Sequence, residues 1–296
     1  MPNVSTAFAD LRTAAEAHHD ASEARAIAFA ALEDAFGLDR TAVFVGKDKQ
    51  FSRDEALLLR QICTALRQGQ PVQYAVGRAL WAGHYFRVTP ATLIPRPETE
   101  GLLQLAIAAL EGLPRAATVL DLGTGSGCLA TMLGLWIQQH RRSAEDTACV
   151  TAWDISEAAL AVARENGRAM GVSVQWERRD MLRAAHEAAQ QSPQYDLMVS
   201  NPPYVCEHER STMARHVLDY EPATALFVPD DDPLRFYRAL VTLAQHALRR
   251  GGTIAVECNS ALVEETAALF PPADFASVTT HDDCFGLPRF VVATRA

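Results

Sequence analysis

The part of the chain after about Ala117 alternates short apolar runs with helical stretches, and this alternation restricts the possible folds more than any other feature. Five of the apolar runs are typical of buried strands. They cover residues 118–122, 150–155, 172–176, 195–199 and 253–256. Buried strands that are joined through helices form a parallel sheet with helices on both faces. We therefore predict an α/β fold for this part of the chain.

Two further runs lie near the end of the chain, at residues 277–280 and 289–294, with no helical pattern between them. A parallel pair would need a crossover connection, which is usually a helix. We expect these two runs to form an antiparallel pair at the edge of the sheet, which brings the predicted strands to seven.

The first 75 residues show helical patterns alone. One helix should end at Phe36, because Gly37 is a suitable C-cap. Another should begin after Ser52, which forms a capping box with Glu55, and should end near Gly69. These patterns predict a small all-helical N-terminal domain.

The residues after the N-terminal helical segment predict a hairpin and then a further helix. Aromatic residues between positions 79 and 88 favour a β-hairpin. Pro97 then suits the first turn of a helix that runs from Glu98 to about Leu110. The sequence thus predicts three parts: a helical domain over residues 1–75, a hairpin linker over 76–96 and an α/β domain over 97–296.

The charge balance is acidic, with 27 Lys and Arg against 36 Asp and Glu, a net charge of −9. Such a chain repels a phosphate backbone at long range, and the sequence shows no obvious basic patch. The N-terminus lacks the pattern of a signal peptide, and the longest apolar run, residues 129–137, is far below the ~20 residues of a membrane span. We expect a cytoplasmic protein without direct nucleic-acid or membrane binding.

The cysteines and histidines do not form a metal-binding pattern. The six cysteines include no C-x-x-C pair, which argues against a zinc ribbon or a thioredoxin-type site. None of the nine histidines falls in a metal-spaced pair on a recognisable helix. We expect reduced, mostly buried thiols and no bound metal.

A glycine-rich turn, Gly123-Thr124-Gly125-Ser126-Gly127, joins the first predicted strand to a helix. Glycines let the backbone approach a nucleotide-like ligand, and ligands of such sheets bind at the carboxyl ends of the strands. Asp154 ends the second predicted strand, where its carboxylate can accept hydrogen bonds from a ribose diol. These residues predict a cofactor site.

The spacing of the glycines decides between cofactors. A dinucleotide fingerprint starting at Gly123 would need Gly or Ala at position 128, which is Cys128, and no P-loop motif exists. The Gly-x-Gly-x-Gly turn follows a strand that carries an acidic residue two positions before the first glycine. This arrangement resembles the S-adenosylmethionine-binding loop of class I methyltransferases, whose fold is Rossmann-like. That resemblance places Asp180, which follows the third predicted strand, near the adenine amino group.

Asn201-Pro202-Pro203-Tyr204 directly follows another strand, so it lies at the same carboxyl edge as the glycine-rich turn. Asn-Pro also begins many ordinary turns. The tetrapeptide resembles the signature of methyltransferases that act on planar nitrogens, which are the amino groups of adenine and cytosine and the side-chain amide of glutamine.

A planar nitrogen is a poor nucleophile because its lone pair is delocalised. The Asn201 side-chain oxygen and the Pro202 carbonyl could accept the two N–H groups of such a target, while Tyr204 covers its flat face. Proline has no N–H to compete, and two prolines in succession stiffen the chain. Because the sulfonium is already an activated leaving group, positioning can supply most of the catalysis, on the order of 7–11 kcal/mol.

Further stretches narrow the resemblance. They are Pro71 to Tyr74, Gly83 to Val88, Leu93 to Glu100, Asp219 to Pro222 and Pro233 to Arg238. Together with the two motifs, they resemble the protein-(glutamine-N5) methyltransferases, specifically those that modify peptide chain release factors, over nearly the whole chain. The resemblance implies a class I methyltransferase sheet of seven strands, preceded by a helical domain that recognises the protein substrate.

Carried over by position, the donor-binding residues of that family are Gly123 to Gly127, Asp154, Met181 and Asn201, and its substrate contacts are Asn201 to Tyr204. Met181 departs from the family pattern, in which an aromatic residue is frequent. The run Glu257-Cys258-Asn259 also departs from the usual sequence after its strand.

The resemblance implies S-adenosylmethionine as the methyl donor and S-adenosylhomocysteine as the product. It implies that the target is the glutamine of the Gly-Gly-Gln loop in class I release factors. Three alternatives stay open: a glutamine of a ribosomal protein, the adenine N6 of DNA, and a non-enzymatic interaction module. A DNA methyltransferase should carry a basic recognition region and bind DNA with a steep salt dependence.

Overall fold

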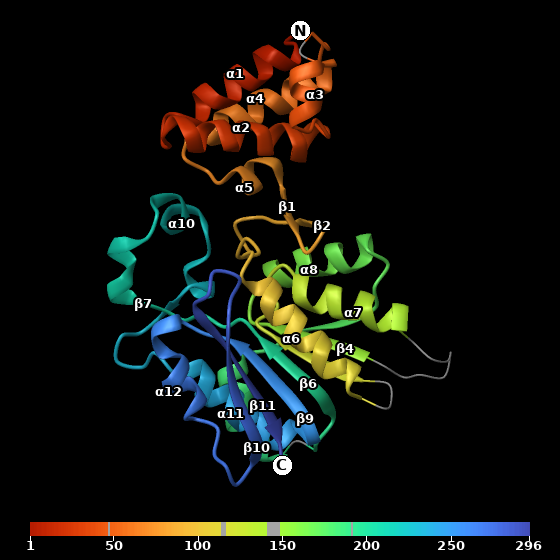
Figure 1. The fold of residues 1–296 in the computed structure, drawn as a ribbon, viewed down its shortest axis with the longest axis vertical. Coiled ribbons are helices and arrows are strands. Elements are labelled where there is room, and N and C mark those ends of the chain that lie inside the picture. Colours follow the sequence, from red (N-terminus) through yellow and green to blue (C-terminus); the bar gives the residue numbers. More distant parts are fainter. Residues whose placement is uncertain (47, 114–116, 141–148, 191) are drawn as a thin grey trace. The chain divides into compact units, whose positions relative to one another are not determined.

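The computed structural model describes residues 1–46, 48–113, 117–140, 149–190 and 192–296, which form two compact units (Figure 1). The first unit contains Met1–Pro90 together with Met213–Glu221. The second contains Ala91–Thr212 and Pro222–Ala296. Among the described residues, no helix is both long and apolar enough to cross a membrane.

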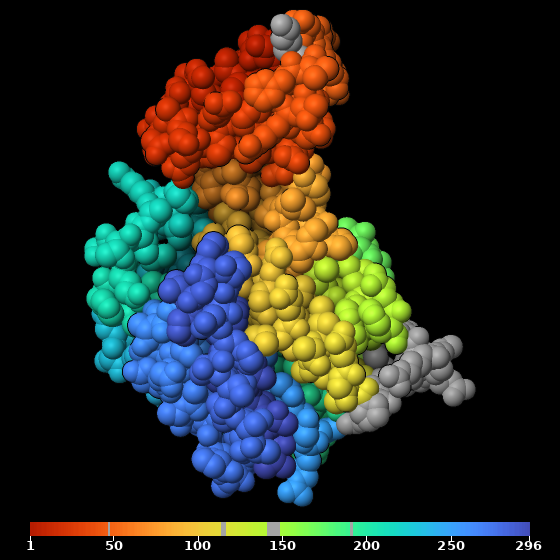
Figure 2. Space-filling view, viewed as in Figure 1, coloured from red at the N-terminus to blue at the C-terminus, as the bar shows by residue number. Residues whose placement is uncertain are grey.

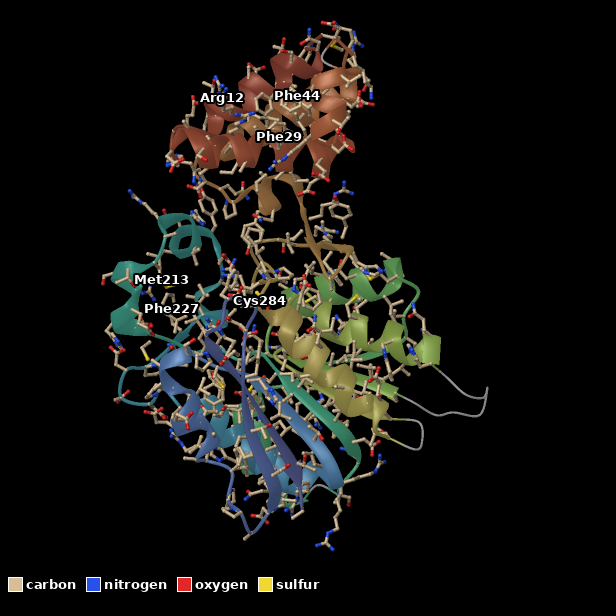
Figure 3. All side chains as sticks on the ribbon, in the orientation of Figure 1. Arg12, Phe29, Phe44, Met213, Phe227 and Cys284 are labelled. Atoms are coloured by element: carbon tan, nitrogen blue, oxygen red, sulfur yellow. The ribbon has the colours of Figure 1, made fainter. Side chains whose placement is uncertain are left out.

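The first unit consists of helices and a hairpin. Its elements are α1 (Val4–Ala15), α2 (Ala21–Phe36), α3 (Arg40–Val45), α4 (Arg53–Arg67), α5 (Val72–Val76), β1 (Arg78–Trp81), β2 (His84–Arg87) and α10 (Arg215–Tyr220). Strands β1 and β2 pair antiparallel, which confirms the hairpin expected between residues 79 and 88. Helices α1 to α5 share one hydrophobic core, in which the Phe29 ring lies 4.7 Å from that of Phe8. The exposed Phe44 ring lies 5.9 Å from the Phe29 ring (Figure 3).

Local sequence signals set the helix ends of this unit. Ser52 Oγ accepts a hydrogen bond from the Glu55 backbone N–H at 3.2 Å, and the Glu55 carboxylate accepts one from the Ser52 N–H at 2.6 Å. The predicted capping box at the start of α4 is therefore confirmed. Gly37 has a φ angle of +66° directly after α2, which confirms its role as a C-cap.

The hairpin and α10 belong to the first unit through long-range contacts. The Tyr85 hydroxyl of β2 is hydrogen-bonded to the Asp34 carboxylate of α2. The Tyr220 hydroxyl at the end of α10 donates to the Gln68 carbonyl at 2.7 Å, although 152 residues separate the two in sequence. Residues Met213–Glu221, which the sequence analysis assigned to the α/β part, thus lie in the same unit as the helices.

The second unit contains a seven-stranded sheet. Its strands are β3 (Thr118–Leu122), β4 (Cys149–Asp154), β5 (Val174–Arg178), β6 (Tyr195–Ser200), β9 (Leu248–Glu257), β10 (Phe275–Asp282) and β11 (Pro288–Arg295). Their order across the sheet is β10-β11-β9-β6-β3-β4-β5. The strands from β9 to β5 are parallel, and β11 runs antiparallel to both β9 and β10. The predicted α/β fold and its antiparallel edge pair are confirmed.

Helices cover both faces of this sheet (Figure 1). One face carries α6 (Thr99–Glu111), α7 (Cys128–His140) and α8 (Glu157–Ala169), and the other carries α9 (Met181–His186), α11 (Arg235–Ala247) and α12 (Val263–Ala267). Gly101 brings the first turn of α6 close to the sheet, because a Cβ there would lie 2.7 Å from the Phe290 ring of β11. In the space-filling view, yellow residues of α6 lie directly beside the blue C-terminal strands (Figure 2).

Strand β5 begins two residues later than the predicted start at Val172. The Val172 N–H donates to the Gly167 carbonyl at 2.9 Å, and the Gly171 N–H donates to the Arg168 carbonyl at 3.1 Å. Gly171 has a φ angle of +67°, so these bonds form a Schellman motif at the end of α8. Val172 therefore closes that helix, and the strand starts only at Val174.

Candidate active site

Three strand ends meet at the carboxyl edge of the sheet. Leu122, the last residue of β3, is paired with Ser200 of β6 on one side and with the residue before Asp154 in β4 on the other. Asp154 and Asn201 therefore leave the sheet on either side of Gly123. The Ser200 hydroxyl donates to the Leu122 carbonyl at 2.7 Å, which ties β6 to β3 at this edge. The register thus brings both sequence motifs and the acidic residue together.

The glycine-rich turn needs its glycines for two reasons. Gly123, Gly125 and Gly127 all have positive φ angles, of +75°, +56° and +78°, a conformation that favours glycine. A Cβ at Gly125 would meet no atom within 4 Å, so the backbone there borders open space. A Cβ at Gly127 would lie only 2.8 Å from the Ala163 Cβ, so this glycine lets the turn pack against α8.

A pocket lies at this edge, with about 660 Å³ of empty space that includes open solvent. Half of the predicted site residues line it: Gly123, Thr124, Gly125, Ser126, Asp154 and Asn201. The other lining residues are Leu93, Pro95, Arg96, Thr99, Cys128, Leu129 and Ala225.

The other half of the predicted site residues lies outside this lining: Gly127, Asp180, Met181, Pro202, Pro203 and Tyr204. The Met181 Cε is still close to the turn, 3.3 Å from where a Cβ of Gly123 would be. Asp180 caps α9, because its Oδ1 accepts the Leu182 N–H at 2.9 Å. One carboxylate oxygen of Asp180 therefore has a structural role.

Asp154 both lines the pocket and fixes the turn. Its Oδ2 accepts the Gly125 N–H at 2.9 Å, and its Oδ1 accepts the Ser156 N–H at 2.8 Å. Burial raises the pKa of this carboxyl, while these backbone N–H groups act in the opposite direction. Each carboxylate oxygen can accept a further bond, which suits the hydroxyl donors of a ribose.

A second buried carboxylate, Asp121 of β3, supports the turn from within the sheet. Its Oδ2 accepts the Thr124 hydroxyl at 2.6 Å, and burial raises its pKa to about 7. Its Oδ1 has no hydrogen-bond partner among the described residues. Asp121 was not predicted as a site residue, although its place in the strand-and-turn motif was an available signal.

A chain of hydrogen bonds runs from Asn201 into the sheet. Asn201 Nδ2 donates to Thr99 Oγ1 at 3.2 Å, and Thr99 Oγ1 donates to Glu257 Oε2 at 2.7 Å. The Tyr204 hydroxyl donates to Glu257 Oε1 at 3.1 Å. Burial is the largest cause that raises the pKa of Glu257, to about 7, and the pKa of the Tyr204 phenol far above its usual value.

Neither Thr99 nor Glu257 was predicted as a site residue. Thr99 belongs to the segment Leu93–Glu100, which the sequence analysis used only for the family resemblance. Four pocket-lining residues come from that segment, so the resemblance itself was a signal for the site. For Glu257 the signal was its position at the end of a buried strand.

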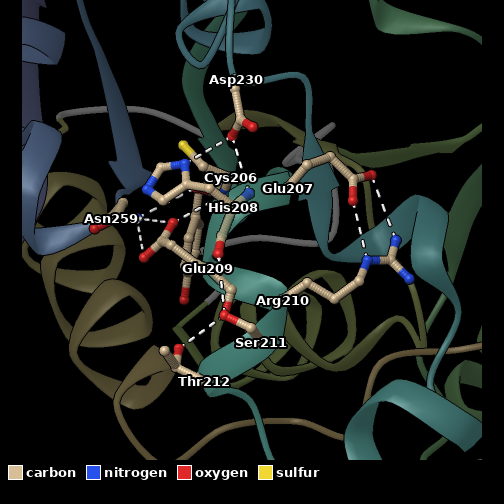
Figure 4. Close-up of polar contacts among 10 residues, drawn as sticks. Cys206, Glu207, His208, Glu209, Arg210, Ser211, Thr212, Asp230 and Asn259 are labelled. Carbon is tan, nitrogen blue, oxygen red and sulfur yellow. Dashed lines mark hydrogen bonds and ion pairs between the residues drawn. The ribbon is translucent and has the colours of Figure 1, made fainter.

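Polar contacts also hold the chain that follows Tyr204 (Figure 4). Asn259 Nδ2 donates to the Glu209 carboxylate at 3.1 Å, so one of the residues that departs from the family pattern anchors this loop. His208 Nδ1 is bonded to Asp230 Oδ1 at 2.7 Å, and the His208 N–H donates to the same oxygen at 3.1 Å. The ligand atoms of Cys206, His208 and Asp230 lie within 4.8 Å of one another, a spacing that could hold a metal ion. The Asp230 carboxylate holds the loop through its two hydrogen bonds to His208.

The sequence matches two known domain families. Residues 103–226 match the Methyltransferase small domain, and residues 11–77 match the PrmC N-terminal domain. Among solved structures, the 16S rRNA N2 G1207 methyltransferase of T. thermophilus is similar, with a TM-score of 0.50. It is 20% identical in sequence and covers 74% of this chain and 50% of its own, so it supports the fold alone.

Curated relatives are more similar in sequence. The release factor glutamine methyltransferase of Bacteroides thetaiotaomicron is 39% identical over 273 residues, which cover 92% of this chain and 93% of the relative. The protein of the same name from Chlorobaculum tepidum is 37% identical over 264 residues, which cover 87% of this chain and 86% of the relative. The chain therefore belongs to the family of release factor glutamine methyltransferases.

Proposed function

We propose that this protein transfers a methyl group from S-adenosylmethionine to the side-chain N5 of the glutamine in the Gly-Gly-Gln loop of class I peptide chain release factors. The observation that carries the proposal is the position of Asn201 in the wall of the pocket beside the glycine-rich turn. The names of the curated relatives support the choice of a release factor glutamine as the target.

The chain has suitable groups to hold the donor. Asp154 offers acceptors for the ribose hydroxyls, and the open space at Gly125 lets the ligand approach the backbone. Asp180 and Met181 lie at the next strand end and are proposed as adenine contacts. When bound, S-adenosylmethionine supplies a methyl group on a cationic sulfur, and the sulfur leaves as a neutral thioether. The target nitrogen gains the N–CH3 bond and gives up one of its two N–H protons to solvent.

The chain's own contribution to the transfer is placement of the target. The Asn201 Oδ1 and the Pro202 carbonyl accept the two N–H groups of the target amide and direct its nitrogen at the methyl group. Pro203 stiffens this loop, and Tyr204 covers the flat face of the amide. Holding two reactants in line is worth on the order of 7–11 kcal/mol of the activation barrier. The proposed reaction uses no metal.

The same proposal assigns the other parts of the chain. Residues 1–75 recognise the release factor and residues 97–296 carry out the transfer. Residues 76–96 link these two parts of the chain. The reaction takes place in the cytoplasm with a protein substrate, without direct binding to nucleic acid or to a membrane. The acidic net charge of −9 supports a protein substrate over DNA.

Replacing Asn201 with alanine tests the assigned role. Asn201→Ala should lower kcat on the order of 10², as losses of one transition-state hydrogen bond do, while the dissociation constant for the donor changes little. Single-turnover methylation of release factor and calorimetric titration with donor measure the two quantities. Gln175→Ala, which removes an exposed amide from β5, is the matched control. An unchanged kcat in Asn201→Ala would contradict the role.

The substrate is tested separately. Labelled donor is incubated with release factor, with ribosomal protein and with DNA, and mass spectrometry locates the methyl group. A release factor with Glu in place of the target Gln should not react, because a carboxylate has no N–H and would face two acceptor oxygens. Sites that hydrogen-bond a substrate N–H lower kcat/KM by a factor of about 10⁴ for analogues that lack this group. Methylation of the ribosomal protein or of DNA alone would refute the proposed substrate.

A further inference from the structure

The amide of Asn201 has two chemically opposite ends. Its Oδ1 can only accept hydrogen bonds, and its Nδ2 can only donate them. The proposed function needs Oδ1 to face the target amide, because a target N–H cannot bond to Nδ2. The group that fixes which end of Asn201 faces the pocket therefore decides whether the site can orient its substrate.

The chain of hydrogen bonds behind Asn201 fixes this orientation. Nδ2 faces Thr99 Oγ1 at 3.2 Å, and the Thr99 hydroxyl in turn lies 2.7 Å from Glu257 Oε2. Above about pH 7 Glu257 is ionised, and an ionised carboxylate accepts and never donates, so the single hydroxyl proton of Thr99 is then directed at Glu257. Thr99 Oγ1 then can only accept from Asn201. If the amide flipped, Asn201 Oδ1 and Thr99 Oγ1 would face each other as two acceptors with no proton between them.

The fold holds this chain in place. Ser200 is paired with Val256, so Asn201 and Glu257 leave adjacent strands at the same level of the sheet edge. Glu257 is 0% exposed and Thr99 is 3% exposed, so little water competes for these bonds. The Tyr204 hydroxyl donates to the second oxygen of Glu257 at 3.1 Å, which leaves Oε2 to Thr99. The three bonds thus form one buried network with a single proton arrangement.

We propose that Thr99 and Glu257 are positioning residues that hold the Asn201 amide with its oxygen directed at the target glutamine. The inference rests on the proposed function and extends it, since Thr99 and Glu257 act through Asn201 and transfer no group themselves. It assigns a function to a buried carboxylate that the reaction does not otherwise use.

Two substitutions at Thr99 separate the hydroxyl from the shape of the side chain. Thr99→Val keeps the volume and removes the hydroxyl, and it should lower kcat for release factor methylation about tenfold, the effect of losing roughly one hydrogen bond. Thr99→Ser keeps the hydroxyl and should restore kcat to within about threefold of the wild type. The donor dissociation constant should change less than about threefold in both variants. A Thr99→Ser variant as slow as Thr99→Val, or a Thr99→Val variant as fast as the wild type, overturns the inference.

Thr131→Val is the matched control. Thr131 is also buried, and its hydroxyl has no hydrogen-bond partner among the described residues. It lies in α7 and does not line the pocket. Removing this hydroxyl should leave kcat within about twofold of the wild type. A loss as large as that of Thr99→Val would mean that any buried hydroxyl matters, which would overturn the inference.

Glu257→Gln keeps the test decisive if Thr99→Val does not fold, and the double variant adds a test of coupling if it does. The Tyr204 hydroxyl donates to Glu257 Oε1, so the glutamine oxygen should stay on that side and the amide NH2 should face Thr99. This NH2 donates to Thr99 and releases the hydroxyl proton toward Asn201, so kcat should again fall about tenfold. Because both residues act through one chain, Thr99→Val and Glu257→Gln together should lose about tenfold and not a hundredfold. Full kcat in Glu257→Gln, or a multiplicative loss in the double variant, refutes the inference. Failure of the wild type to methylate release factor glutamine would instead refute the proposed function.

Discussion

Glu257→Gln should stabilise the protein at pH 8 much more than at pH 5, relative to the wild type. Glu257 is fully buried, and burial is the largest of the effects that raise its pKa from 4.5 to about 7. The hydrogen bonds from Thr99 and Tyr204 act against burial and lower the pKa. Among the surrounding charges, Glu98 raises the pKa and Arg289 lowers it. The folded protein therefore binds the Glu257 proton more tightly than the unfolded chain does.

The direction of the pH effect follows from this difference. The neutral form of Glu257 contributes its full stability below pH 4.5, and this contribution is lost as the pH rises toward 7 and above. Between pH 5 and pH 8 the loss is about 2–3 kcal/mol, because each pH unit between the two pKa values costs roughly 1 kcal/mol. Glutamine cannot ionise, so Glu257→Gln does not have this loss. The stability difference between variant and wild type should therefore grow by about 2–3 kcal/mol over this interval.

Urea unfolding at pH 5 and at pH 8, followed by tryptophan fluorescence, measures the effect. Three of the four tryptophans, Trp136, Trp153 and Trp176, lie in the same unit as Glu257. Glu265→Gln, at an exposed position of α12, is the control and should show little change with pH. A stability difference between Glu257→Gln and wild type that is equal at both pH values would refute the argument that burial governs this carboxyl.

Two further predictions concern stability alone. Gly134→Ala in α7 should destabilise the protein by about 1–3 kcal/mol in urea unfolding, because the new Cβ would lie 2.3 Å from Val172 Cγ1. Gly112→Ala, where the nearest atom would be 3.6 Å away, is its control, and equal stability of the two variants would contradict the steric argument. Ser52→Ala removes one partner of the capping box and should cost about 1 kcal/mol. A melting temperature equal to that of the wild type would show that the box adds nothing to α4.

The sequence by itself determined the features that depend on near neighbours. The capping box at Ser52 and the C-cap at Gly37 are built from residues at most five apart, so local spacing was sufficient to predict them. The glycine-rich turn and Asn201 could be placed at one sheet edge for a related reason. Both directly follow buried strands, and parallel strands end at the same edge of a sheet.

A prediction from a short-range pattern was wrong where two signals applied to the same residue. Val172 fitted a strand by its apolar character, but the Schellman motif after Gly171 used its N–H to close α8. The helix end has unsatisfied backbone groups that Val172 satisfies, which the alternation of apolar runs does not reveal. The ligand contact of Asp180 stays a prediction, and its Oδ1 in addition caps α9.

Only the tertiary structure decided which distant residues support the site. Thr99 and Glu257 are separated by 158 residues and become neighbours because β9 lies beside β6 while α6 packs on the sheet. Likewise, α10 lies in the helical unit through a bond from Tyr220 to Gln68. Strand order, register and helix packing arise from the burial of whole apolar faces, and no local spacing specifies them. For this reason the sequence placed Asn201 at the edge of the sheet where the pocket lies, and the fold was needed to find the residues that hold its side chain.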